Sequence, residues 1–95
     1  IGGFSKRKRV CILSEKSEEL TKYIMNDLNR GVTLYDAKGG YDGKVRQEIV
    51  TILAKNEYAL LMNYIRENDP KAFVTVSTVS EVVGIWNINK HKLRT

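Results

Sequence analysis

The sequence has very little of the residues from which most enzyme and metal sites are built. Its 95 residues include one cysteine, Cys11, and one histidine, His91. The chain can therefore form neither an internal disulfide nor a cluster of cysteine and histidine metal ligands. Cys11 lies in the apolar run RVCILS, which indicates a buried, inert side chain. Because a histidine in a basic tail is usually solvated, we expect no catalytic residue, no metal and no cofactor.

Long apolar runs and disorder-promoting residues are also scarce. No stretch is long enough to cross a bilayer, and no signal-peptide pattern is present. There is one proline, and 42% of the residues are hydrophobic, as in an ordinary folded domain. The length suits a single domain, and the lack of disulfides favours a reducing, cytoplasmic compartment. The chain begins with Ile1 in place of methionine, so we expect a piece of a longer protein.

Positive charge exceeds negative charge, and the excess gathers at the two ends. The net charge is +5 and the pI is about 9.4, with the basic runs KRKR at residues 6–9 and KHKLR at residues 90–94. Such ends are typical of a solvated flank, a nucleic-acid patch or a segment beside an anionic membrane. We assign residues 1–7 to a basic flank, residues 8–84 to the folded domain and residues 85–95 to a polar, basic tail.

Hydrophobic periodicity predicts four strands and two helices. The strands are expected at residues 8–13, 32–36, 44–55 and 72–79, which are short, rich in β-branched residues and bounded by polar or glycine-rich segments. The helices are expected between them. Ser14 or Ser17 would cap the first helix and a left-handed Gly31 would end it, while Asn56 would cap the second and Pro70 would end it. The expected core stripes are Leu20, Ile24 and Leu28 on the first helix and Tyr58, Leu61, Met62 and Ile65 on the second.

The order β-α-β-β-α-β predicts an α+β, ferredoxin-like fold, with an antiparallel four-stranded sheet and both helices on one face. The opposite face of the sheet has no helix to cover it. We expect it to carry Thr33, Tyr35, Thr51, Leu53, Phe73 and Thr75. A mixed apolar face of this kind usually packs against another copy or another domain, so we expect a homo-oligomer.

Three stretches resemble one known family. They are RGVTLYDAKGGYDG at residues 30–43, NDPKAFVTVSTVSEVVG at residues 68–84, and the first strand followed by EELTKYIMNDLNRG at residues 18–31. Together they resemble the C-terminal domain of YitT-type bacterial membrane proteins, a domain of unknown function, over residues 8–84. The resemblance implies a ferredoxin-like fold similar to ACT and PII-type regulatory domains, which bind metabolites or nucleotides at subunit boundaries. It also implies a multi-span membrane region ahead of the domain, which would place the basic run at residues 6–9 beside the cytoplasmic leaflet.

The sequence departs from the family pattern after Gly84. The family continues with a second glycine and an aromatic residue, whereas this chain continues with Ile85 and Trp86. A ligand contact that the family supplies at this point is therefore missing here, unless Trp86 provides the aromatic group.

The glycine-rich segment between the second and third strands has two interpretations. Its glycines can be plain turn residues, because positive φ angles cost glycine little. Alternatively, the backbone amides can cradle an anion, with a nearby cation, a hydroxyl and an aromatic face for a base. Given the resemblance we favour ligand binding, and since a strand separates the two ends of the segment, we favour a site shared between copies. The predicted ligand-binding residues are Arg30, Thr33, Gly39, Gly40, Tyr41 and Gly43.

RNA binding is an alternative, since the RNA-recognition fold has the same topology. That fold stacks bases on aromatic residues of its central strands, but RVCILS and RQEIVTILA contain none, so no specific nucleic-acid partner is expected. We interpret the chain as a non-catalytic regulatory or sensory domain on the cytoplasmic side of a multi-span membrane protein, which binds a small anion, for example a nucleotide. The main alternative is a purely structural oligomerisation module.

Overall fold

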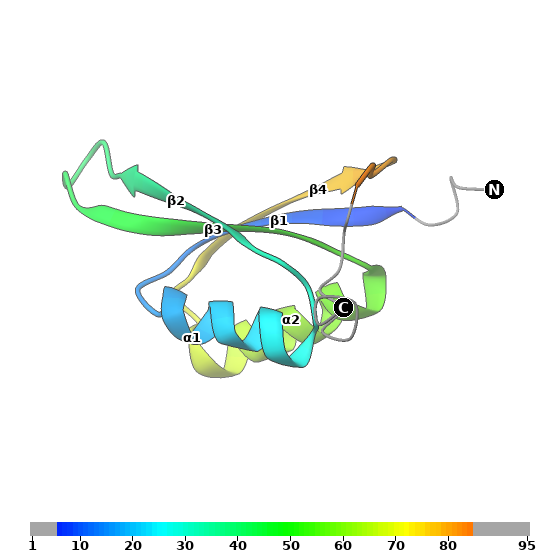
Figure 1. The fold of residues 1–95 in the computed structure, drawn as a ribbon. Coiled ribbons are helices and arrows are strands. Elements are labelled where there is room, and N and C mark those ends of the chain that lie inside the picture. The colour runs from blue at the N-terminus through cyan, green and yellow to red at the C-terminus, as the bar shows by residue number, and fades with distance from the viewer. Residues whose placement is uncertain (1–5, 85–95) are drawn as a thin grey trace, which may run out of the picture.

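A computed structural model describes residues 6–84 of the chain. These residues form an antiparallel four-stranded sheet with the helices on one face (Figure 1). The strand order is β2-β3-β1-β4, and each neighbouring pair is antiparallel. This is the predicted ferredoxin-like fold. The elements are β1 (Arg7–Leu13), α1 (Ser17–Lys22), η2 (Tyr23–Asp27, a π-helix), β2 (Thr33–Lys38), β3 (Val45–Leu53), α2 (Lys55–Asn68) and β4 (Phe73–Val79).

The core lies between the sheet and the helices. Alternate residues of the two central strands meet the helical stripes, and the predicted stripe residues are all buried or packed against the buried cluster. Each fully buried aliphatic side chain contributes about 1.5–3 kcal/mol, so this layer supplies most of the stability. The buried apolar residues are Val10, Ile12, Leu20, Ile24, Leu28, Ile49, Leu53, Leu61 and Ile65.

The first helix widens before it ends. From Tyr23 it continues as the π-helical turn η2, in which the Leu28 N–H donates to the Tyr23 carbonyl at 3.2 Å. Asn29 then adopts a left-handed conformation with φ of 61°, and the Arg30 N–H closes the end by donating to the Ile24 carbonyl at 3.1 Å. The prediction that Gly31 takes the left-handed position was wrong, because asparagine also tolerates this conformation and comes earlier in the chain.

The predicted helix caps were wrong at both N-termini. Lys16 precedes α1 and no side chain caps the helix, although Ser14 Oγ accepts the Lys16 N–H at 2.8 Å in the turn before it. The second helix follows β3 directly, so Ala54 takes the capping position and Asn56 lies inside α2. The Glu57 carboxylate accepts the Ala54 N–H at 2.8 Å and satisfies one of the amides that a helix start leaves open.

The sheet face opposite the helices is called the helix-free face below. Because side chains alternate along a strand and paired residues share a face, the strand register assigns Thr33, Tyr35, Phe73 and Thr75 to it, as predicted. Its apolar members are Cys11, Leu13, Tyr35, Ala37, Val50, Ile52, Phe73 and Val79. Cys11 was predicted to be buried but is only partly so, and the Arg9 guanidinium lies 3.1 Å from its Sγ.

Two residues were assigned to the wrong face. Thr51 and Leu53 are buried on the helix side, because they alternate with Val50 and Ile52 in β3. The run of apolar and β-branched residues at the end of β3 offers no alternation from which the phase can be read, and a one-residue slip moves every side chain to the other face.

The basic run at residues 6–9 is largely part of the sheet. Arg7 to Arg9 belong to β1, so the strand begins one residue earlier than the expected domain start. The Lys8 Nζ donates to Thr78 Oγ1 on β4 at 3.3 Å. Among residues 6–84, no helix has the length and hydrophobicity that crossing a bilayer requires. The expected tail at residues 85–95, with Trp86 and His91, lies outside the described residues.

Candidate functional site

The tip of the β2–β3 hairpin is a tightly hydrogen-bonded turn. The Gly39 N–H donates to the Lys44 carbonyl at 2.8 Å, and the Gly43 N–H donates to the Gly39 carbonyl at 2.9 Å. Asp42 Oδ1 accepts the Lys44 N–H at 3.0 Å, while its Oδ2 pairs with the Arg46 guanidinium at 2.8 Å. The hydrogen bond from Arg46, followed by that from the Lys44 amide, lowers the pKa of the Asp42 carboxyl.

The three glycines of this turn have different roles. Gly43 has a φ of 70°, which favours glycine, and a Cβ at Gly39 would collide with the Asp42 carboxylate. The turn geometry therefore explains both residues, and their amides are already paired with carbonyls of the turn. Gly40 has no positive φ, and a Cβ there would meet nothing within 4 Å. The turn geometry thus does not require glycine at position 40.

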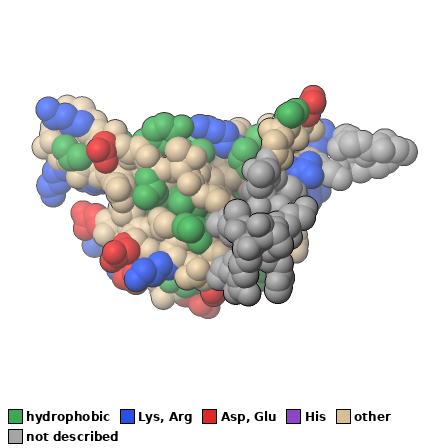
Figure 2. Space-filling view, viewed as in Figure 1, with side chains coloured by type: hydrophobic (Ala, Val, Ile, Leu, Met, Phe, Trp, Pro, Cys, Tyr) green, Lys and Arg blue, Asp and Glu red, His purple; other side chains and the backbone are tan. Residues whose placement is uncertain are grey.

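The outermost residues of the tip are available for binding. Tyr41 is fully exposed, and within residues 6–84 the amides of Gly40, Tyr41 and Asp42 donate no hydrogen bond. Lys38 and Lys44 flank the turn and are exposed. The hairpin extends beyond the helix layer (Figure 1), and basic side chains cluster at its end (Figure 2). The tip therefore offers open amides, two cations and one aromatic ring to an anion.

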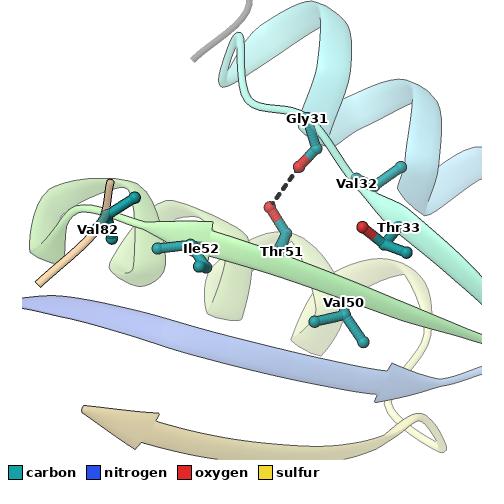
Figure 3. A pocket seen from close by; sticks show the side chains of 7 residues that line it. All are labelled: Gly31, Val32, Thr33, Val50, Thr51, Ile52 and Val82. Carbon is teal, nitrogen blue, oxygen red and sulfur yellow. Dashed lines mark hydrogen bonds between the residues drawn. The ribbon is translucent and has the colours of Figure 1, made fainter. Parts of the chain in front are cut away.

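Thr33 lies at the other end of β2, beside a shallow pocket of about 270 Å³ (Figure 3). The pocket forms where the chain before β2 separates from β3. Thr51 Oγ1 donates to the Gly31 carbonyl at 2.9 Å and holds this segment against the sheet. Apart from Thr33 and Thr51, the pocket is lined by glycine and aliphatic residues, namely Gly31, Val32, Val50, Ile52 and Val82. It carries no charged side chain among its lining residues, so a charged ligand would find no counter-ion there.

Arg30 belongs neither to the hairpin tip nor to the residues that line the pocket beside Thr33. Its Nε is 2.9 Å and 3.0 Å from the two carboxylate oxygens of Glu57. The side chains of Arg30 and Glu57 are only 12% and 15% exposed, and the same carboxylate caps α2. The pair therefore links the end of the first helix to the start of the second, which is a structural role.

The predicted ligand residues are thus not all brought together. Gly39, Gly40, Tyr41 and Gly43 meet at the hairpin tip, while Thr33 and Arg30 lie before β2 or at its start. The six residues of β2 span roughly 20 Å, so one small anion cannot contact both groups within one copy. A role in ligand binding stays a prediction for all six residues.

A larger cleft was missed by sequence reasoning. It has a volume of about 610 Å³ and lies between the turn after β1 and the turn before β4. Lys16, Lys71 and Arg46 line it together with Glu15 and Asp69. Glu15 and Lys16 come from the turn after β1, Asp69 and Lys71 from the turn before β4, and Arg46 from β3. The antiparallel pairing of β1 with β3 and β4 brings these segments together. No pattern within either turn could have revealed the cleft.

The cleft and the hairpin tip are connected through Arg46. Its guanidinium lines the cleft and holds Asp42 in the turn. On the floor of the cleft, the Ser14 hydroxyl donates to the Asp69 carboxylate, and Lys16 Nζ donates to the Asn68 carbonyl at 2.8 Å. Tip and cleft form one polar region at one end of the sheet, with basic groups at several points. Among residues 6–84, no three His, Cys, Asp or Glu side chains are grouped so that they could hold a metal ion.

The relatives found by sequence comparison are named as membrane proteins. The chain is 33% identical over 84 residues to the UPF0750 membrane protein YxkD of Bacillus subtilis (strain 168), which covers 88% of this chain and 30% of YxkD. It is 35% identical over 83 residues to YpjC of the same organism, covering 87% of this chain and 28% of YpjC. YitT, also from that organism, is 25% identical over 75 residues, or 79% of this chain and 27% of YitT. The chain thus spans less than a third of the length of these three relatives.

Solved structures confirm the fold. A crystal structure of a DUF2179 protein from Eubacterium ventriosum has a TM-score of 0.64 at 30% identity, covering 75% of this chain and 97% of the other. A putative PII-like signaling protein from Thermus thermophilus has a TM-score of 0.59 at 21% identity, covering 93% of this chain and 95% of the other. The second likeness concerns the fold alone.

Residues 30–84, more than half of the chain, match the family described as "Uncharacterized protein conserved in bacteria (DUF2179)". This match begins at Arg30, and so it contains the hairpin, the second helix and the last strand. The predicted resemblance to YitT-type membrane proteins is confirmed by the relatives named above. The chain belongs to the bacterial DUF2179 family, as a domain of the kind that occurs in YitT-type membrane proteins.

Proposed function

We propose that this chain is a non-catalytic regulatory domain of a multi-span bacterial membrane protein and that it binds a small anionic ligand, with nucleotides as the leading class. The membrane region is proposed because the relatives are named membrane proteins and are about three times as long as their match to this chain. The basic run at residues 6–9 supports the cytoplasmic side. Residues 1–7 are proposed as the membrane-proximal flank, residues 8–84 as the binding domain and residues 85–95 as a tail.

The observation that carries the ligand proposal is the hairpin tip above the cleft. Tyr41 is fully exposed, although burial of a large aromatic side chain is favourable and this one has no core to pack on. An aromatic face with open amides and nearby cations suits a ligand that has both a ring and a charged group. The likeness to a protein named as PII-like signaling agrees with a regulatory role for such a fold.

Calorimetric titration with ATP, GTP and inorganic phosphate tests this proposal. We expect a nucleotide to bind. Tyr41→Ala should weaken binding by about tenfold, which lies within the roughly 1–3 kcal/mol of a base–aromatic stack. Gly40→Val should also weaken binding, because the added side chain restricts the backbone and crowds the anion. Tyr35→Ala on the helix-free face is the matched control, since Tyr35 is also an exposed tyrosine, and it should leave the affinity unchanged. Native mass spectrometry of the purified chain complements the titration, since it reports any ligand that is carried through purification. The proposal fails if none of the probes binds at millimolar concentration and no ligand is carried over.

Lys71→Ala tests the role of the cleft. Lys71 is exposed and lines the cleft, whereas Lys55 is an exposed lysine at the start of α2 and serves as its control. If the ligand's charged group enters the cleft, Lys71→Ala weakens binding and Lys55→Ala does not. Equal effects of the two substitutions would show that only the net charge of the domain matters.

The second candidate function is an oligomerisation module without a ligand. It is favoured by Tyr35 and Phe73, which are 51% and 63% exposed on the helix-free face. A tight oligomer that responds to none of the probes would support this function over ligand binding. Self-association is compatible with both functions, because a regulatory domain can also assemble.

A further inference from the structure

The helix-free face has an ordered arrangement that the strand register defines. Its residues lie in rows across the strands, and neighbours within a row come from neighbouring strands. The central row is Thr33, Val50, Cys11 and Thr75, one flanking row is Tyr35, Glu48, Leu13 and Phe73, and the other is Ile52, Arg9 and Ser77. The middle of the face, between Val50 and Cys11, is therefore apolar. In Figure 2 this face is seen in profile along the upper edge, where hydrophobic and basic side chains lie near each other.

Two charged residues lie on opposite sides of this middle point. Arg9 is on β1 in one flanking row, and Glu48 is on β3 in the other. Arg9 and Glu48 are separated by four residue positions along the strands and by one strand spacing across the sheet. The distance between their Cα atoms is therefore about 14 Å. Neither side chain forms an ion pair with any residue of the described chain, and the hydrogen-bond partner of Arg9 is the sulfur of Cys11. Arg7 and Arg46 lie on the same face nearer its two ends, and Arg46 is already paired with Asp42. Among the described residues, Arg9 and Glu48 are thus a cation and an anion of this face that form no ion pair.

This placement matches a two-fold axis. In a two-fold interface, if one residue contacts a second residue of the other copy, the second contacts the first in return. Consider an axis that is parallel to the sheet and about 5 Å above the helix-free face, half the usual distance between packed sheets. If it passes over the point between Val50 and Cys11 and runs perpendicular to the line from Arg9 to Glu48, it turns a second copy face down onto the first. Arg9 of each copy then lies over Glu48 of the other, and two ion pairs form across an apolar centre.

The same operation covers the exposed aromatic residues. It carries Tyr35 of each copy toward Ile52 of the other, and Phe73 toward Thr75 of the other. In projection onto the sheet, Cys11 lies within half a strand spacing, or roughly 2.4 Å, of the axis, so the two Cys11 side chains face each other. A single arrangement thus pairs Arg9 with Glu48 and covers both aromatic rings.

We propose that the helix-free face is a two-fold interface between two copies of this chain, held by reciprocal Arg9–Glu48 pairs, with Cys11 beside the axis. The inference deepens the self-association described above and does not depend on a ligand. Four strands about 4.8 Å apart and roughly 20 Å long give a flat face of about 400 Å² per copy. The two copies together would bury about 800 Å², which is below the roughly 1,200 Å² of standard stable interfaces, so we expect a weak dimer with a dissociation constant of tens of micromolar.

Charge reversal tests the pairing. Arg9→Glu places two carboxylates opposite each other, and Glu48→Arg places two guanidinium groups opposite each other, twice in each dimer. Each single change should raise the dimer dissociation constant by about tenfold or more, as measured by sedimentation equilibrium. The double variant, with both changes in one chain, restores opposite charges and should return to within about threefold of the unmodified chain. Because the two residues are too far apart to pair within one copy, such rescue can only arise between copies.

Crosslinking tests the position of the axis on the unmodified chain and requires no mutation. Packed sheets lie about 10 Å apart, too far for a direct disulfide between backbones, so a short bifunctional thiol reagent that spans about 5–8 Å is the probe. Cys11 is the only cysteine in the chain, and we expect a crosslinked dimer in high yield. In the control chain, Cys11→Ser with Ser77→Cys, the two thiols would be more than about 15 Å apart and should not crosslink.

Three results would overturn the proposal. If the chain remains monomeric at about 0.2 mM, well above the expected dissociation constant, the helix-free face is not an interface between two copies. A dimer without rescue in the double variant would place the charges elsewhere. A dimer whose Ser77→Cys chain crosslinks as well as the Cys11 chain would place the axis elsewhere. Circular dichroism of each variant verifies that it is folded, so that a lost dimer is not mistaken for a lost fold.

Discussion

Replacing Arg30 by alanine should destabilise the domain, because it leaves a largely buried carboxylate without its counter-charge. Arg30 Nε contacts both oxygens of Glu57, at 2.9 Å and 3.0 Å, and the Glu57 side chain is 15% exposed. Removing one partner of a fully buried pair costs about 3–5 kcal/mol. Since water still reaches this pair in part, we expect a loss of about 2–3 kcal/mol from the free energy of unfolding.

The matched variant is Glu57→Gln, which removes the charge but keeps an oxygen to accept the Ala54 N–H that now bonds to Glu57 at 2.8 Å. We expect it to cost less than Arg30→Ala, about 1–2 kcal/mol. The double variant should cost less than the sum of the two, since each single change removes the same contact. Urea unfolding followed by circular dichroism measures all three values, and a loss of about 2–3 kcal/mol corresponds to a fall in Tm of roughly 10–20 °C.

A change in stability below about 0.5 kcal/mol for Arg30→Ala would refute this reasoning, since that is the range of ordinary surface substitutions. The ion pair would then be dispensable, and the charge of Arg30 would be available for the ligand role that the sequence suggested. Binding that is lost without loss of stability would support that role directly. Loss of both together would mean that Arg30 acts through the fold.

Three further predictions concern the hairpin and the basic run. Gly39→Ala should destabilise the chain because the new Cβ collides with Asp42. At Gly40 a Cβ has open space, so Gly40→Ala should change the free energy of unfolding by less than about 0.5 kcal/mol. Equal effects of the two substitutions in urea unfolding would contradict the turn geometry. Arg46 lowers the pKa of the Asp42 carboxyl. The ion pair should therefore persist at every pH above the ordinary aspartate pKa and be lost only as the pH falls through the lowered pKa. A titration midpoint at or above the ordinary pKa, measured by carbon-detected NMR, would refute the pair. Since the run at residues 6–9 carries four positive charges, we expect it to give salt-sensitive co-sedimentation with phosphatidylserine vesicles, with each cation that reaches the surface contributing about 1 kcal/mol. Equal binding to neutral vesicles at low salt would favour a solvated flank.

Much of the fold could be predicted because it depends on local periodicity. The four-residue spacing of Leu20, Ile24 and Leu28 identifies one face of a helix whatever surrounds it, and these residues are buried as predicted. The order of strands and helices then restricts the topology to few choices. The phase of β3 could not be predicted, because consecutive apolar residues leave the alternation ambiguous and only packing against the helices decides that Thr51 and Leu53 face inward.

The candidate site was less accessible to prediction for a different physical reason. The glycine-rich tip is local, so its turn residues could be recognised from the sequence, and Gly39 and Gly43 are explained by the turn itself. The Arg30–Glu57 pair joins residues 27 positions apart, and no short-range pattern encodes it. The cleft lined by Lys16 and Lys71 forms only when two turns meet at the end of the sheet. Sequence reasoning therefore grouped Arg30 with the loop that follows it, although folding directs the two to different places.

The most direct test of the central claim is an NMR titration of the uniformly ¹⁵N-labelled chain with ATP and with inorganic phosphate. If the hairpin tip and the cleft bind an anionic ligand, the amide signals of Gly40 and Tyr41 shift in a saturable way, together with those near Lys71, while amides on the outer side of α2 stay unchanged. Shifts confined to the pocket beside Thr33, or no saturable shift with either probe at millimolar concentration, would contradict the claim.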